Sequence, residues 1–175
     1  MRWLLVAAIS YVCLVVETAA FRPGALAIEV DGHWARPDLV LAVGLFVAFF
    51  FEPAEVFVAG WCLGLASDLV SVAGRLGLKA LLFSAVLAAV SLIRTDLPRT
   101  RIWGHFATAL VVVFAVHLAW YVTTRLVGGA GLWLGRSAEE SFLDAFYTAV
   151  LAPYLFWGLL AIRVPLRIAV GSGRE

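Results

Sequence analysis

Apolar residues fill six stretches of the chain, and most of the charged residues lie outside these stretches. A helix needs about 20 residues to cross the hydrocarbon core of a bilayer, with a range of roughly 17–25. The second stretch is shorter than this and the fourth is marginal, so we expect them to thin the bilayer, borrow flanking residues or be shielded by neighbouring helices. The pattern predicts six transmembrane helices, with five as the alternative, at approximately 3–20, 37–51, 53–72, 76–93, 102–126 and 142–162.

The composition explains why a membrane is the expected solvent. Of the 175 residues, 63% are hydrophobic and 14% are charged, whereas ordinary soluble domains have roughly 45–50% and 25%. A soluble domain of this size cannot bury so much apolar surface. The expected fold is an all-α membrane protein, a polytopic helical bundle forming one domain over residues 1–175. The net charge of +1, without a long basic run, gives no sign of nucleic-acid binding.

Proline and polar residues mark the expected helix ends. Pro37 and Pro53 suit the first turn of a helix, where the missing N–H is not needed. The segment Glu52-Pro53-Ala54-Glu55 is a very tight link, which predicts a helical hairpin from the second and third spans.

Two serine–acid pairs precede the last span. Ser137-x-x-Glu140 and Ser141-x-x-Asp144 have the spacing of a capping box, which predicts that this helix begins near 142. Pro153 predicts a kink in it, with Thr148 and Tyr147, one turn or more earlier, as possible compensating donors.

Arginine and lysine in short loops indicate the orientation. In a six-span arrangement they divide seven to six between the two sides. The two densest groups, at 94–101 and 163–174, fall on one side, which favours both termini in the cytoplasm.

Small residues form a stripe on the third span. On a helix they share one narrow arc, which lets another helix approach closely. We expect this stripe to pack against a helix of the same chain or of a partner. Its residues are Gly60, Gly64, Ser67, Ser71 and Gly74.

Asp68 lies at the margin of the stripe, and an acid within a span should face protein or water. It can hydrate at the headgroup level. It can accept hydrogen bonds from a neighbouring helix or the 74–77 turn, or pair with Arg75 or Lys79. It can also be a proton or substrate site. The structural interpretation, with hydrogen bonds or an ion pair to these neighbours, is favoured.

Other ionisable or reactive groups within the spans are few. Glu17 is expected at the membrane interface, and His117 is expected to bond a neighbouring hydroxyl or carbonyl. Cys13 and Cys62 lie in apolar runs and are expected to be small hydrophobes, without a disulfide or metal. Gly64-Leu65-Ala66-Ser67 has the wrong spacing for an intramembrane serine protease. No metal motif or phosphate loop is present, so no enzyme, cofactor or metal site is predicted.

Four ordered motifs carry a family resemblance. They are Arg36-Pro37-Asp38-Leu39-Val40-Leu41, then Gly60-x-x-x-Gly64-Leu65-x-x-Asp68-Leu69, then Gly74 with Gly77-Leu78-x-Ala80, and finally Tyr147-Thr148 before Pro153. In this order the chain resembles the rod shape-determining protein MreD family. The family often has Asn where this chain has Thr148.

The resemblance implies a non-enzymatic inner-membrane subunit of the bacterial cell-elongation machinery for rod shape and peptidoglycan synthesis. It implies binding to MreC, a single-span coiled-coil protein, and through it association with RodA, a penicillin-binding transpeptidase and MreB. The implied fold is similar to the S components of energy-coupling-factor transporters.

That fold supplies the alternative function, a vitamin-capturing S component. Such a protein needs an outward-facing pocket with polar groups from different helices. The loop residues Arg22, Glu29, Asp31, His33 and Trp34 can line one. A third interpretation, lipid or polyprenyl-phosphate handling, depends on Arg75 and Lys79.

Overall fold

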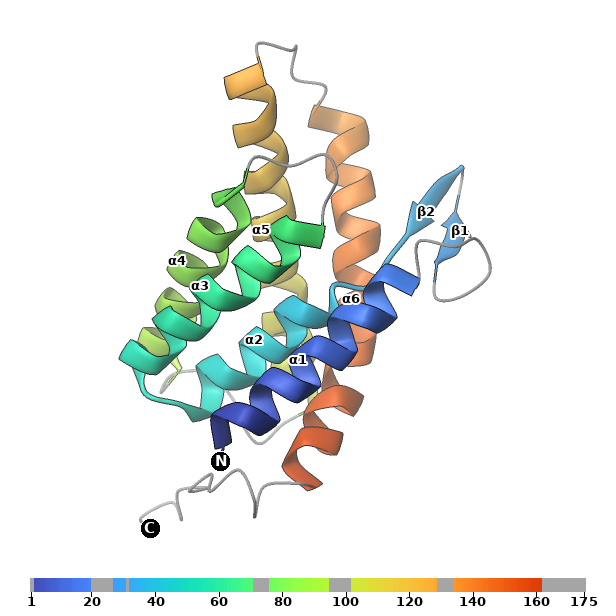
Figure 1. Ribbon diagram of the computed structural model, residues 1–175. Coiled ribbons are helices and arrows are strands. Elements are labelled where there is room, and N and C mark those ends of the chain that lie inside the picture. The colour runs from blue at the N-terminus through green and yellow to red at the C-terminus, as the bar shows by residue number, and fades with distance from the viewer. Residues whose placement is uncertain are drawn as a thin grey trace.

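The computed structural model describes residues 2–19, 27–30, 32–70, 76–94, 102–128 and 134–161. Across these residues the chain forms six helices and one short antiparallel hairpin (Figure 1). The helices are α1 (Arg2–Ala19), α2 (Leu39–Phe50), α3 (Pro53–Val70), α4 (Leu78–Ile93), α5 (Ile102–Gly128) and α6 (Leu134–Ala161). Strands β1 (Ile28–Val30) and β2 (His33–Ala35) pair between α1 and α2, a feature that the apolar pattern did not predict.

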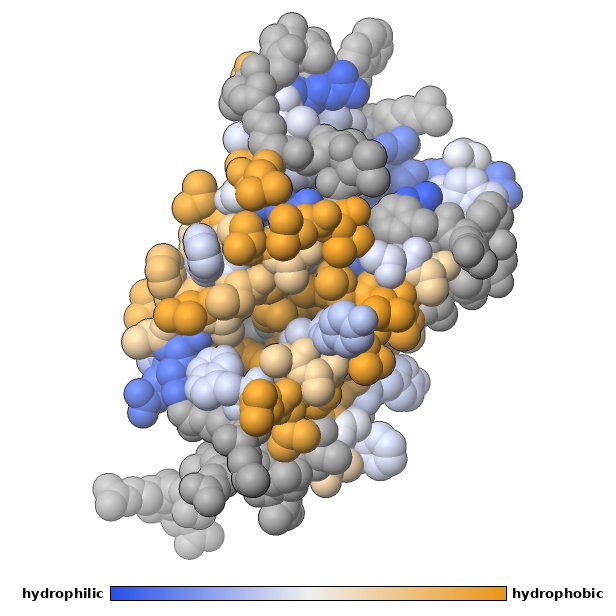
Figure 2. Space-filling view, viewed as in Figure 1, coloured by the Kyte–Doolittle hydropathy of each residue, from blue (hydrophilic) through white to orange (hydrophobic). Residues whose placement is uncertain are grey.

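The helices are those of a polytopic membrane protein. Within α3, α5 and α6 lie segments long and apolar enough to cross a bilayer, and three further apolar helices are shorter. Apolar side chains cover the middle of the face seen in Figure 2. Many large hydrophobic residues on the surface are more than half exposed, among them Leu4, Leu69, Leu81 and Leu92. This exposure is expected where the lateral solvent is lipid.

α2 is the helix around which the bundle is built. It has 12 residues, and those from Val40 to Phe49 are all buried. It contacts α1, α3, α4, α5 and α6. At 1.5 Å per residue it is only about 18 Å long, shorter than the hydrocarbon core. Of the three alternatives considered for this short segment, shielding by neighbouring helices is therefore the one confirmed.

Both ends of α2 are closed by polar groups. At its start Asp38 is the N-cap, and its Oδ1 atom accepts a hydrogen bond from the backbone N–H of Leu41 at 2.8 Å. At its end the guanidinium of Arg94, just after α4, donates to the carbonyl of Phe51. These contacts satisfy backbone groups that a helix cannot satisfy internally, which matters most in an apolar interior.

Two of the predicted helix starts are wrong. Pro37 precedes the Asp38 cap and lies outside α2, because the carboxylate of Asp38 takes the cap position. α6 begins at Leu134, before the predicted start near 142, so both serine–acid pairs lie inside the helix. Residues with capping-box spacing also share one face of a helix, and here the serines and acids lie on such a face and do not cap the helix. Pro53, by contrast, is the first residue of α3, as predicted.

Candidate functional site

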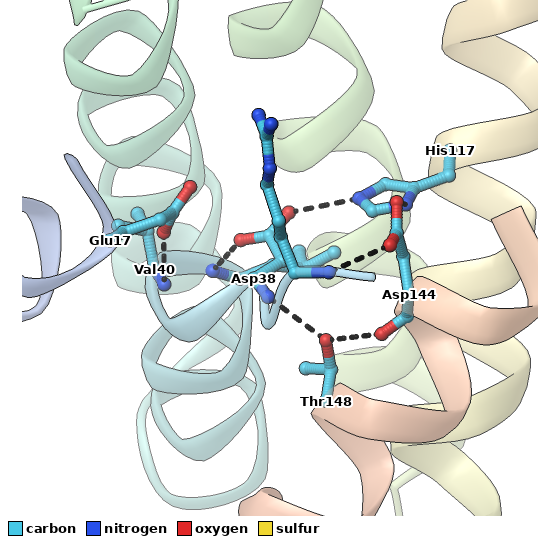
Figure 3. A network of polar contacts seen from close by, with 8 residues as sticks. Glu17, Asp38, Val40, His117, Asp144 and Thr148 are labelled. Carbon is cyan, nitrogen blue, oxygen red and sulfur yellow. Dashed lines mark hydrogen bonds and ion pairs between the residues drawn. The ribbon is translucent and has the colours of Figure 1, made fainter. Parts of the chain in front are cut away.

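A polar network surrounds the start of α2 (Figure 3). The backbone N–H of Asp38 donates to the hydroxyl of Thr148 on α6 at 2.9 Å. Its carboxylate Oδ2 lies 3.3 Å from Nε2 of His117 on α5. The carboxylate of Glu17, near the end of α1, accepts from the N–H of Val40 at 3.4 Å. Four helices are thus joined at the start of α2.

Asp144 on α6 extends the network to the hairpin. Its Oδ1 atom accepts from the backbone N–H of Arg36 at 2.9 Å and lies 3.3 Å from Nε2 of His33 on β2. Its Oδ2 atom stands 3.9 Å from Nδ1 of His117. Asp144 therefore fixes the hairpin and the segment before α2 against the α5–α6 pair.

Thr148 is fully buried and uses its hydroxyl twice. It donates to the carbonyl of Asp144 one turn earlier at 2.7 Å, and it accepts from Asp38. The hydroxyl therefore does not serve the backbone near Pro153, and the prediction of Thr148 as a compensating donor there is wrong. Back-bonding to the preceding turn is the geometry that a threonine on a helix readily adopts.

The prediction for the partner of His117 is also wrong. Its partner is the carboxylate of Asp38, with Asp144 close by, and not a hydroxyl or a carbonyl. Asp38 and Asp144 are far from His117 in sequence, so only the fold brings the three together. A signal was present on α6: Ser137, Glu140, Ser141, Asp144 and Thr148 recur at helical spacing and form a polar face.

That face borders a cavity of about 230 Å³ next to the network, which we call the polar pocket. Lys79 on α4 and Trp120 on α5 line it from other helices, and Phe83 and Val116 add apolar surface. Its principal polar residues are Asp38, Lys79, His117, Trp120, Glu140 and Asp144. Of the loop residues considered for a pocket, His33 lines it, whereas Arg22 and Asp31 lie outside the described residues.

Asp68 is buried, with 4% of its surface exposed, at the end of α3. Its Oδ2 atom accepts hydrogen bonds from the backbone N–H groups of Gly77 at 2.8 Å, Lys79 at 3.1 Å and Ala80 at 3.4 Å. A carboxylate at a helix N-terminus satisfies free N–H groups and complements the helix dipole. Gly77 has φ +95°, a conformation that L side chains rarely adopt. Asp68 thus holds the first turn of α4.

The small-residue stripe faces α4 along its described part. A Cβ atom added at Gly60 would lie 2.9 Å from Cα of Ser84. One added at Gly64 would lie 2.5 Å from both Cα of Ala80 and the carbonyl oxygen of Lys79. Ser67 is buried on the same helix, while Ser71, Gly74 and Arg75 lie outside the described residues. This part of the stripe packs within the chain.

A second cavity, of about 430 Å³, lies between α1 and α3, and we call it the apolar groove. It is lined by both large and small side chains, with Trp3 and Tyr11 of α1 and Val40 of α2 among the large ones. The small residues are Ala7, Ser10, Ala59, Cys62 and Ala66.

These features define a polytopic helical membrane protein in which many of the buried polar groups hold helix ends together. Among the described residues, no group of three or more His, Cys, Asp or Glu side chains could hold a metal ion.

Comparison with known families gives the identification. The family model described as rod shape-determining protein MreD matches residues 1–161, and the chain belongs to this family. It is a rod shape-determining membrane protein of the cell-elongation machinery, and it is not an enzyme. The family resides in the cytoplasmic membrane. Neither a curated protein nor a solved structure matches the chain.

Proposed function

We propose that this protein is a membrane scaffold that binds an MreC-like single-span coiled-coil protein and thereby joins RodA, a penicillin-binding transpeptidase and MreB in one complex. We further propose that six helices cross the membrane with both termini in the cytoplasm. The start of α1 and the end of α6 lie at the same end of the bundle (Figure 1), which supports an even number of crossings. The arginine groups at 94–101 and 163–174 favour the cytoplasm for that end.

The observation that carries the scaffold proposal is the apolar groove. Gly60 and Gly64 are already in contact with α4, so a partner helix must use another face of α3. The groove offers one, with Ala59, Cys62 and Ala66 at helical spacing. Small side chains let two helix backbones approach closely, which drives helix association in lipid. The single transmembrane helix of the partner fits this chemistry.

Cys62 allows a direct test, because it is exposed and lines the groove. The chain has two cysteines, so the Cys13→Ser variant leaves Cys62 as the only thiol. A photoactivatable maleimide attached there in native membranes should cross-link to the MreC-like protein, identified by mass spectrometry. The control variant removes both cysteines and carries Trp157→Cys, at a residue 76% exposed on α6.

The outcome separates the possible occupants of the groove. Cross-links to the MreC-like protein from Cys62 and few from position 157 support the proposal. Equal yields from both positions, or cross-links from Cys62 to lipid alone, would show that the partner helix does not occupy the groove.

The polar pocket is the observation that favours the alternative, a vitamin-capturing S component. Its volume of about 230 Å³ is below the roughly 300–1,000 Å³ of sites for drug-sized ligands. Mass spectrometry of the denatured, purified protein distinguishes the two functions. Repeated recovery of one vitamin-like compound at near-equimolar amount would overturn the scaffold proposal.

A further inference from the structure

Two histidines contact two carboxylates where the hairpin and the start of α2 lie against α5 and α6. The four residues are His33, Asp38, His117 and Asp144. We propose that they form a pH-dependent contact, which we call the histidine clamp. When both histidines carry a proton, the clamp holds the hairpin and the start of α2 to the α5–α6 pair. When the histidines lose their protons at higher pH, these elements are held less firmly.

The ring of His117 lies between two carboxylates (Figure 3). Its Nε2 atom is 3.3 Å from Oδ2 of Asp38, and its Nδ1 atom is 3.9 Å from Oδ2 of Asp144. A neutral imidazole carries one N–H, so one of its nitrogens would point a lone pair at a carboxylate oxygen. A protonated ring has an N–H on both sides. The arrangement of the two carboxylates therefore fits the charged form of His117.

His33 makes the second contact of the clamp, from β2 to α6. Its Nε2 atom is 3.3 Å from Oδ1 of Asp144, the oxygen that also accepts from the backbone N–H of Arg36 at 2.9 Å. A neutral His33 can donate to this carboxylate, and protonation turns the contact into an ion pair. Two positive rings then face two negative carboxylates, and Asp144 joins the hairpin to the same network as the start of α2.

Protons reach both rings from the aqueous phase on the hairpin side of the membrane. His33 and His117 line the polar pocket, and 24% and 25% of their side-chain surfaces are exposed. In the proposed topology this side is extracytoplasmic. Histidine is the side chain whose ordinary titration falls between about pH 5 and pH 8. The strength of the clamp therefore follows the external pH.

Other ionisable groups around the clamp decide which controls the test needs. Lysine, arginine and tyrosine titrate above this pH range in model peptides, whereas a buried carboxyl group can titrate within it. The two carboxyl neighbours therefore need variants of their own. Glu29 pairs with Trp34, so it lies on the opposite face of the hairpin from His33. The neighbours are Glu17 on α1, Arg36 before α2, Lys79 on α4, Tyr121 on α5 and Glu140 on α6.

The test is hydrogen–deuterium exchange of the full-length protein in lipid nanodiscs at about pH 5 and about pH 8. Each measured rate is divided by the intrinsic exchange rate at the same pH. The protonated rings make the stabilising contacts, so protection of the segment 33–41 should be highest at the lower pH. It should fall at least about threefold at the higher pH, because two partly buried ion pairs are lost. Equal protection of this segment at both pH values overturns the proposal.

Glutamine variants tie the response to the two histidines, because glutamine can donate a hydrogen bond but cannot gain a proton in this range. His33→Gln and His117→Gln should each reduce the change in protection, and the double variant should abolish it. His105→Gln replaces the third histidine of the chain, and it should retain the change, as should Glu17→Gln and Glu140→Gln. A full change in the double variant, or loss of the change in a control, overturns the proposal.

A measurement on the unaltered protein keeps the test independent of how well the variants fold. With ¹³C-labelled histidine, the ring signals of His33 and His117 should titrate between the two pH values. They are assigned from the single variants, whose melting temperatures at the lower pH establish that they are folded. If none of the histidine signals titrates in this range, the clamp does not respond to pH and the proposal is wrong.

Discussion

Replacing Gly64 with alanine tests how closely α3 and α4 must approach. The new Cβ would lie 2.5 Å from Cα of Ala80 and from the carbonyl oxygen of Lys79, both of which are backbone atoms. Carbon atoms in contact normally stand about 3.5–4.0 Å apart, so the helices must separate locally by about 1 Å. Overpacking costs about 1–3 kcal/mol. We expect the upper end here, because backbone yields less easily than the end of a flexible side chain.

Alanine also stabilises a helix relative to glycine by about 1 kcal/mol, which leaves a net loss of about 2 kcal/mol. That corresponds to a melting temperature lower by about 4–8 °C for a chain of this size. The assay is thermal unfolding of the purified protein in one detergent. Gly158→Ala is the matched control, because a Cβ there meets nothing within 4 Å. If Gly64→Ala melts at or above the Gly158→Ala temperature, the close contact is not what holds these helices.

Lys79 and Ala80 also donate to Asp68, so Gly64 and Asp68 hold the same turn of α4. A double-mutant cycle between Gly64→Ala and Asp68→Asn should therefore be non-additive, since both changes act on one contact. Additive losses in melting temperature would show that the two residues act independently.

Further predictions concern the caps and the topology. Asp68→Asn keeps one acceptor oxygen and should lower the stability of the protein only slightly. Asp68→Leu leaves three backbone N–H groups without an acceptor and should lower the stability by at most about 1–3 kcal/mol for each unsatisfied group. A Leu variant as stable as the Asn variant contradicts this. Thr148→Val should lower the melting temperature more than Thr148→Ser, because serine loses only a buried methyl group and keeps the hydroxyl that contacts Asp38 and Asp144; equal melting of the two variants would refute it. Reporter fusions after Gly32 and Thr100 should read outside and inside, and any other pair of signals contradicts the proposed topology.

The sequence predicted the helices better than the site. Runs of apolar residues located all six helices, and of the three alternatives considered for the short 37–51 segment, shielding by neighbouring helices is the one that α2 shows. The start of α6 was misplaced because a serine followed three residues later by an acid has the same spacing in a capping box and on a helix face.

The network around Asp38 lay beyond such reasoning. Its contacts join Asp38 to His117 and Thr148, residues separated by 79 and 110 positions. Periodicity describes neighbours on one helix and carries no information about which helices meet. The hydrogen bonds of Asp68 were foreseen as one alternative because Gly77, Lys79 and Ala80 follow it closely in sequence.

The enclosure of α2 bears on how the chain enters the membrane. A helix of 12 residues is too short to be held in the bilayer core by itself, yet it is packed on every side in the finished bundle. Its tight link to α3 through Glu52 suggests that the two segments insert together as one unit, with α3 providing the anchor. Because α2 is enclosed by other helices, its length does not have to match the thickness of the bilayer. We therefore expect membranes of different thickness to disturb α3, α5 and α6 first, while α2 keeps its place among them.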